Sequence, residues 1–139
     1  AIEARLFDRI EPTPESTLEA DPETLREAGL SASKAEYAQN LAAAWTENDW
    51  SRAHFVEQAD DDVVAELTTV RGIGTWTAKM FLVFGLGRED VFPVEDLGIR
   101  KAMWQVIDED LTRAEMVETA ERWKPYRSYA SEYLWRTID

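Results

Sequence analysis

Two glycines separated by one residue form the most informative pattern in the sequence. Gly72 and Gly74 would let the backbone turn sharply between two helices and would let another group approach the peptide plane. The amides around Ile73, Gly74 and Thr75 are expected to face outward at a helix N-terminus, a geometry that binds anions. Arg71 adds a formal positive charge beside them. An ordinary helix–turn–helix connection is the alternative, because a lone Gly-x-Gly pattern is weakly specific.

The acidic residues avoid this stretch and two others. Residues 67–88, 97–107 and 122–131 contain no Asp or Glu, although they hold 8 of the 15 Lys and Arg residues of the chain. A chain this acidic is expected either to present such segments to an anion or to bury them, and the sequence leaves both readings open.

Composition excludes several kinds of functional site. The 139 residues include no cysteine, which rules out a disulfide scaffold, a Cys-ligated zinc site, an iron–sulfur cluster and a thiol nucleophile. His54 is the single histidine, so a site with several histidine ligands is excluded too. A hydrophobic content of 45% argues against overall disorder, and no apolar run is long enough to span a membrane.

The net charge of −13 is unusual for a protein that binds nucleic acid, and taken alone it argues against such a partner. Only 4 of the 15 cationic residues are lysines. An acidic, lysine-poor composition fits a halophilic protein in a salt-rich cytoplasm, and a merely acidic domain is the alternative. In either case we expect a cytoplasmic protein.

Helix caps and breakers divide the chain into short helices, with almost no strand signal. Asp21 followed by Pro22 starts one helix that Gly29 ends, and Thr112 with Glu115 forms a capping box for another. Only residues 90–94 look extended. Further helices are predicted at residues 2–10, 33–47, 61–69, 75–84, 96–107 and from 125 onward. The sequence therefore predicts an all-α fold with a single domain over residues 1–139.

Three motifs, in order, resemble a known family. Val70–Ala78 resembles the helix-hairpin-helix of base-excision DNA glycosylases, and Val91–Arg100 resembles the segment with that family's catalytic aspartate. Ala120–Ala130 resembles a C-terminal motif of its alkylbase branch, the type II 3-methyladenine glycosylases. The resemblance to this superfamily, called HhH-GPD, implies an orthogonal helical bundle. In the family a helix and a wedge loop precede the part that matches residues 2–10, so the sequence is expected to lack that N-terminal segment.

The resemblance implies a role for Asp96 as the catalytic aspartate. An N-cap for the helix that starts there is the other reading, and one residue can serve both purposes. Trp76 stands where glycosylases that also cut the DNA strand carry a nucleophilic lysine, which implies a monofunctional hydrolase. Lys79, one turn further on, is interpreted as a phosphate contact or a surface charge.

A base pocket and a DNA grip are implied in the same way. The pocket would comprise Trp76, Met80, Trp135 and Tyr126, which would stack on an electron-poor base turned out of the duplex. Met80 occupies a position where relatives carry tyrosine.

The hairpin positions Arg71, Gly72, Ile73, Gly74 and Thr75 would bind the phosphates of the strand. Carbonyl oxygens of Thr68, Val70 and Ile73 would hold a monovalent cation, K⁺ or Na⁺, which is the only cofactor implied.

The resulting hypothesis is a monofunctional DNA-3-methyladenine glycosylase II-type enzyme of base excision repair. It would hydrolyse the N-glycosidic bond of alkylated purines in double-stranded DNA, with no membrane and no protein partner implied. The alternative is a non-catalytic helix-hairpin-helix module that binds a DNA backbone or a protein. Such a module would share Gly72 and Gly74 but would have no use for Asp96 after Pro93.

Overall fold

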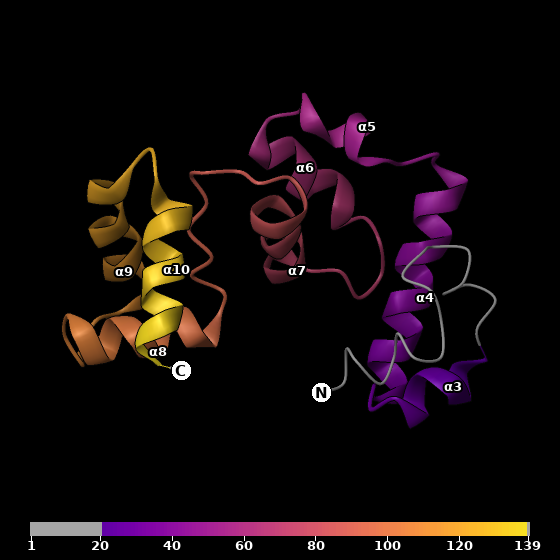
Figure 1. Ribbon diagram of the computed structural model, residues 1–139, viewed down its shortest axis with the longest axis horizontal. Coiled ribbons are helices and arrows are strands. Elements are labelled where there is room, and N and C mark those ends of the chain that lie inside the picture. The colour runs from indigo at the N-terminus through magenta and orange to yellow at the C-terminus, as the bar shows by residue number, and fades with distance from the viewer. Residues whose placement is uncertain (1–20, 139) are drawn as a thin grey trace. The chain divides into compact units, whose positions relative to one another are not determined.

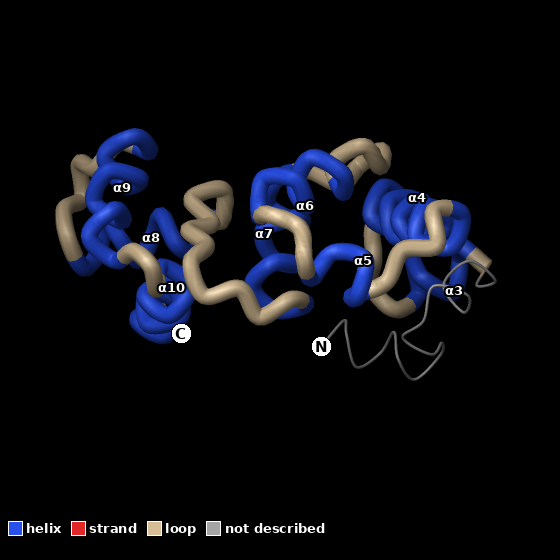
Figure 2. The backbone as a smooth tube through the Cα atoms, turned by 90° about the horizontal axis from the view of Figure 1, so that it is seen from above, coloured by secondary structure: helices blue, strands red, loops and turns tan. Residues whose placement is uncertain are grey.

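The computed structural model divides the chain into two compact units, Ala1–Gly74 and Thr75–Asp139. The structure describes residues 21–138, and the helix predicted at residues 2–10 lies outside them. Helices joined by loops, with no strand, make up this described part of the chain (Figure 2). The prediction of an all-α fold is therefore confirmed.

The first unit contains four described helices (Figure 1), which are α3 (Pro22–Glu27), α4 (Ala32–Glu47), α5 (Arg52–Val56) and α6 (Asp60–Leu67). The predicted cap of α3 is present, because the Asp21 side chain accepts a hydrogen bond from the Glu23 amide at 3.0 Å. Gly29 follows this helix with a φ of 114°, a conformation that favours glycine. The sequence analysis missed α5, which is a single short turn capped by Ser51.

Three aromatic rings connect α4 to α5 in the core of this unit. The ring centroids of Trp45, Trp50 and Phe55 lie 5.5, 5.7 and 6.1 Å apart. Trp50 and Phe55 are buried, and Trp45 is half-buried between them. Such edge-on and tilted ring contacts add to the free energy gained by burying apolar area.

The second unit begins with α7 (Thr75–Met80), which continues as the π-helix η1 (Phe81–Gly85). After a loop come α8 (Leu97–Val106), α9 (Arg113–Ala120), the 3₁₀ turn η2 (Glu121–Trp123) and α10 (Arg127–Thr137). The predicted capping box of α9 is present between Thr112 and Glu115. Helix α10 packs against α8 around a core that includes Ile99, Met103, Met116 and Leu134. Trp104 and Trp123 pack partly buried against it.

Hydrogen bonds hold the loop between η1 and α8 against the start of α10. Ser128 Oγ donates to the Arg88 carbonyl at 2.7 Å and accepts from the Val91 amide at 2.9 Å. The Arg127 guanidinium donates to both carboxylate oxygens of Asp90, at 2.7 and 3.1 Å. Residues 90–94, predicted to be extended, form no strand and are largely buried. These contacts fix the path of the chain toward Asp96.

Candidate active site

Asp96 is the N-cap of α8, as the sequence predicted. Its backbone is extended, and its Oδ2 atom accepts a hydrogen bond from the Ile99 amide at 3.0 Å. An aspartate at this position satisfies an amide that the helix leaves unpaired, and the helix dipole favours its negative charge. The interpretation of Asp96 as an N-cap is therefore correct. Its other hydrogen bonds determine whether the carboxylate could also take part in a reaction.

Two indole rings donate to the same carboxylate. Trp76 Nε1, on α7, lies 2.7 Å from Asp96 Oδ1, and Trp135 Nε1, on α10, lies 2.8 Å from Asp96 Oδ2. The side chain is half-buried among them. Three helices of the second unit thus meet at one carboxylate, and the structure brings together three of the residues that the sequence singled out.

These hydrogen bonds keep Asp96 ionised. Partial burial raises the pKa of this carboxyl, but the N–H donors of Trp135, Trp76, Ile99 and Gly98 outweigh that effect, and the pKa is lowered from its ordinary value. At neutral pH the site therefore presents a negative charge held in a fixed orientation.

Gly98 makes room for this arrangement, and the sequence analysis missed it. A Cβ atom on Gly98 would lie 2.9 Å from Asp96 Oδ2 and 3.3 Å from Trp135 Cδ1. The first turn of α8 can therefore approach both groups only because residue 98 has no side chain. A glycine in the first turn of a predicted helix was the available signal, since glycine is otherwise unfavourable there.

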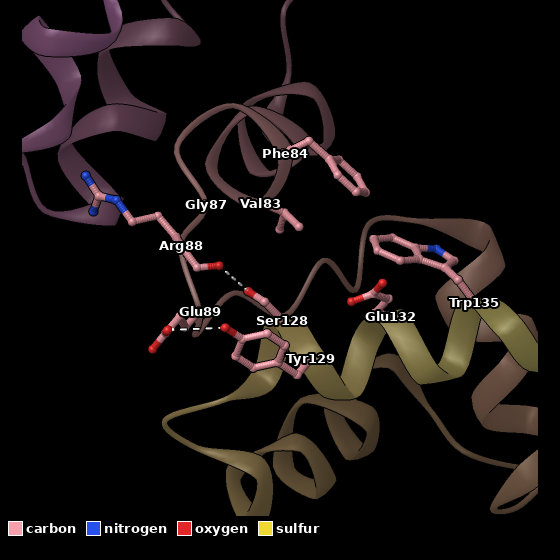
Figure 3. Close-up of a pocket in the computed structure, with 9 residues that line it drawn as sticks. All are labelled: Val83, Phe84, Gly87, Arg88, Glu89, Ser128, Tyr129, Glu132 and Trp135. Carbon is pink, nitrogen blue, oxygen red and sulfur yellow. Dashed lines mark hydrogen bonds between the residues drawn. The ribbon is translucent and has the colours of Figure 1, made fainter.

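A cavity of about 290 Å³ opens beside the Trp135 ring, between the η1 region and α10. Phe84 of η1 is 71% exposed and stacks on Trp135, with ring centroids 5.8 Å apart and planes 27° apart. Figure 3 shows both rings at one end of this cavity and the Glu132 carboxylate of α10 near them. Its volume approaches that of small-ligand pockets, which begin at about 300 Å³.

The other predicted pocket residues lie elsewhere in the second unit. Met80 is half-buried at the end of α7, and Tyr126 is 56% exposed at the start of α10. Neither lines the cavity. Trp76, which is 47% exposed, does not line the cavity either, whereas Phe84 and Tyr129 do. The assignment of Trp76, Met80 and Tyr126 to a base pocket stays a prediction.

The glycine turn has the shape that the sequence predicted, with one difference. Gly72 has a φ of +91°, and a Cβ there would lie 1.9 Å from Tyr37 Cδ1, so glycine is required at this position. Gly74 faces open space, and α7 begins at Thr75. The Ile73 amide does not face outward, because it donates to the Val70 carbonyl at 3.0 Å and so closes the turn.

The acid-free segments are neither uniformly exposed nor uniformly buried. Arg71, Lys101 and Arg122 are exposed and have no side-chain partner among the described residues. The other five cations of these segments have partners. Three of them form ion pairs: Lys79 with Glu95, Arg127 with Asp90, and Lys124 with Glu121. Arg100 donates a hydrogen bond to the Val94 carbonyl, and Arg88 also has an interaction partner. Lys79 is thus not the free surface charge that was one of its two sequence interpretations, and the other, a phosphate contact, stays a prediction.

Two kinds of site are missing from residues 21–138. These residues hold no cluster of three or more acidic or histidine side chains suited to a metal ion, and none of their helices is long and apolar enough to cross a membrane.

Comparison with known proteins gives consistent matches. The family model described as "HhH-GPD superfamily base excision DNA repair protein" matches residues 1–125. DNA-3-methyladenine glycosylase 2 of Escherichia coli is 37% identical over 91% of this chain and 42% of its own length. DNA-3-methyladenine glycosylase 1 of Schizosaccharomyces pombe is 33% identical over 91% of this chain and 57% of its own length. The chain thus spans about half the length of these relatives.

A solved structure has the same fold. The 3-methyladenine DNA glycosylase of Schizosaccharomyces pombe, in complex with abasic DNA, superposes with a TM-score of 0.86 at 30% identity. The match covers 96% of this chain and 70% of that one.

Proposed function

The chain belongs to the HhH-GPD superfamily of base excision DNA repair proteins, and from this membership we propose that it hydrolyses the N-glycosidic bond of alkylated purines in double-stranded DNA. The relatives named as 3-methyladenine glycosylases support this reaction class. The proposal includes a cytoplasmic location, where the enzyme would meet its DNA. The observation that carries it is the ionised Asp96 carboxylate, held by two indole N–H groups, one of which belongs to Trp135, whose ring lines the cavity.

The leaving base needs no general acid in this reaction. When the C1′–N bond breaks, its electron pair stays with the base, and an alkylated, cationic purine leaves as a neutral molecule. Positive charge then develops on the sugar, and a fixed carboxylate stabilises it. The oxygen of a water molecule bonds to C1′, and the proton that it loses passes to solvent.

Asp96 is suited to electrostatic stabilisation more than to proton abstraction. Three N–H donors at 2.7, 2.8 and 3.0 Å share the negative charge of its carboxylate. Such donors favour the charged form and make the carboxylate a weak base. We therefore assign Asp96 to stabilising the sugar cation, with the indoles of Trp76 and Trp135 holding it in place.

Trp76 also supports the monofunctional reading. An indole has no nucleophilic amine, and its N–H is engaged with Asp96. A Schiff base with the sugar, which is how strand-cutting glycosylases proceed, is therefore not expected from residue 76. Reduction with borohydride on damaged DNA should trap no covalent adduct.

The hairpin completes the proposal by binding the DNA backbone. The exposed Arg71, Gly74 and Thr75 would face a phosphate, with Gly72 and Ile73 shaping the turn between them. Carbonyl oxygens of Thr68, Val70 and Ile73 suit a monovalent cation, which binds backbone carbonyls well. The Val70 oxygen keeps a second lone pair after accepting the Ile73 amide. Bound there, the cation would add positive charge to a chain of net charge −13.

Release of free base from methylated duplex DNA at high KCl tests the proposal, with Asp96→Asn as the matched variant. Asparagine keeps the N-cap, so the helical circular dichroism should not change. Base release should fall by at least about 100-fold, the usual cost of losing charge stabilisation in a transition state. Binding without base release in the unaltered chain would instead support the non-catalytic module, and near-normal turnover in the variant would remove Asp96 from the mechanism.

A further inference from the structure

Lys79 lies in a semi-enclosed site next to the catalytic segment. Its side chain is 23% exposed, and its Nζ atom lies 2.8 Å from Glu95 Oε1 and 3.1 Å from Glu95 Oε2. The same ammonium donates to the Phe92 carbonyl at 3.1 Å. Two of its three N–H groups thus donate hydrogen bonds, to Glu95 Oε2 and to the Phe92 carbonyl, whereas the contact with the buried Glu95 Oε1 is an ion-pair contact without hydrogen-bond geometry.

Lys79 is the main source of positive charge beside the Glu95 carboxylate. Glu95 is 20% exposed, and its other cationic neighbour, Arg113, has its Nη2 atom 3.7 Å away and a side chain that is 56% exposed. Burying a carboxylate to this extent costs free energy of desolvation unless a cation is paired with it. Glu95 is also the residue directly before Asp96, so its position bears on that of the catalytic carboxylate.

Lys79 and Trp76 lie three residues apart and therefore on one face of α7. Trp76 contacts the Asp96 carboxylate, while Lys79 contacts the Glu95 carboxylate and the carbonyl at the start of the same turn. From the other side, Arg100 of α8 donates to the Val94 carbonyl at 2.8 Å. The turn itself is closed by the Asp96 amide, which donates to the Pro93 carbonyl at 2.9 Å.

We propose that Lys79 is a positioning residue, whose ion pair with Glu95 fixes the turn 92–96 so that the Asp96 carboxylate meets both indoles. This role rests on the proposed function, since it concerns the group that stabilises the sugar cation. Lys79 itself contacts neither base nor phosphate. It acts through Glu95 and the backbone of the turn.

Lys79→Met tests the role, because methionine keeps the length of the side chain and removes the ammonium. Single-turnover base release at saturating protein should fall by about 100-fold, since displacing a catalytic group by an ångström has a cost of that size. The Kd for DNA containing an abasic-site analogue should change by less than about 3-fold, because no phosphate contact is lost. Lys34→Met, at an exposed lysine of α4, is the control for the loss of one positive charge and should alter neither quantity.

Two other results would overturn the proposal. If Lys79→Met weakens DNA binding and leaves the single-turnover rate intact, Lys79 is a phosphate contact. If its melting temperature falls but the rate per folded molecule stays normal, the pair has only a structural role.

A second measurement separates this proposal from the proposed function. The chain has six tryptophans, and the indole N–H resonances of Trp76 and Trp135 can be assigned by replacing each with phenylalanine. Because these protons bond to the Asp96 carboxylate, Lys79→Met should shift both, whereas Lys34→Met should shift neither. This readout needs no turnover. Unchanged resonances would contradict the positioning role even if the protein releases no base.

Glu95→Gln and the double variant Lys79→Met/Glu95→Gln complete the test. Glutamine keeps the shape of Glu95 and one acceptor oxygen, so its loss of rate should be smaller, about 10-fold. It also provides a folded variant if Lys79→Met does not fold. If Lys79 acts through Glu95, the double variant should be no slower than Lys79→Met alone. Losses that multiply would show that the two residues act independently, and would refute the proposal.

Discussion

At the residue scale, the proposed function predicts that the hydrogen bonds to Asp96 set the pH range of base release. The pKa of this carboxyl is lowered, so it stays ionised at pH values where an ordinary aspartate takes up a proton. Since the ionised form stabilises the sugar cation, the rate should be constant on the acid side of neutrality. It should fall only when the pH falls through the lowered pKa.

Trp135→Phe should raise the pKa of Asp96, because it removes the N–H donor at Oδ2. The acid limb of the pH–rate profile should therefore move to higher pH, even if the variant also has a different maximal rate. Trp104→Phe is the matched control, since the indole of Trp104 donates to the Leu111 carbonyl and not to Asp96. If the acid limb lies at the same pH in the unaltered chain and in both variants, the indole of Trp135 does not lower the pKa of Asp96.

Gly98→Ala adds a single methyl group against the carboxylate. Alanine favours a helix by about 1 kcal/mol over glycine, which should offset part of the clash with Asp96 and Trp135. The melting temperature should therefore change little, while base release falls by about 10-fold or more because the carboxylate must move. Normal activity in this variant would show that the first turn of α8 tolerates a side chain.

Single residues also show where sequence reasoning ends. Asp96 was predictable because an N-cap is a local feature, set by the residues that directly follow it. Its bonds to Trp76 and Trp135 join residues 20 and 39 positions apart, and no local pattern encodes such a meeting. The family resemblance identified both tryptophans, but it gave no hint that their N–H groups point at the carboxylate. Phe84, exposed and stacked on Trp135, was missed because its apolar neighbours suggested a buried helix.

At the element scale, the attachment of α10 to the loop before Asp96 carries a pH dependence of its own. Hydrogen bonds from Arg127 lower the pKa of Asp90, which otherwise would be raised by burial. A carboxyl with a lowered folded-state pKa contributes stability above its unfolded pKa, and loses it as the pH falls through the folded one.

Asp90→Asn should destabilise the folded protein at pH 7 by about 2 kcal/mol, the range of charge-assisted hydrogen bonds that are lost. The difference from the unaltered chain should shrink as the pH falls below the ordinary pKa of aspartate, because Asp90 then takes up a proton in the unfolded chain while it stays ionised in the folded protein. Urea unfolding of the variant and of the unaltered chain, at pH 7 and at pH 3, measures the difference in their free energies of unfolding at each pH. Equal differences at the two pH values would contradict the lowered pKa.

Helices with strong end signals were predicted well, and those without were not. The capping box of α9 and the Asp-Pro start of α3 are local signals, so the sequence located the start of each of these two helices correctly. Helix α5 has five residues and lies in an acidic stretch without clear periodicity. The change from α7 to the π-helix η1 follows from tertiary packing, and apolar periodicity does not distinguish the two helix types.

At the scale of the whole molecule, a net charge of −13 has to be reconciled with the proposed DNA partner. The acid-free segments reduce the local repulsion, and three of their cations are exposed without described partners. The other five are engaged within the protein, so side-chain charge would supply little of the binding. Backbone amides and a bound cation would then have to supply the rest.

The choice of salt cation therefore tests how the molecule binds DNA. At equal ionic strength, KCl and tetramethylammonium chloride screen the self-repulsion of the acidic surface alike, so both should raise the melting temperature similarly. Only K⁺ is small enough for the carbonyls of Thr68, Val70 and Ile73, so the Kd for DNA should be about 10-fold lower in KCl, roughly 1.4 kcal/mol of binding. Gly72→Ala should abolish this difference, because a Cβ would lie 1.9 Å from Tyr37 Cδ1 and force the turn open. Equal affinity in both salts would mean that peptide dipoles alone bind the strand.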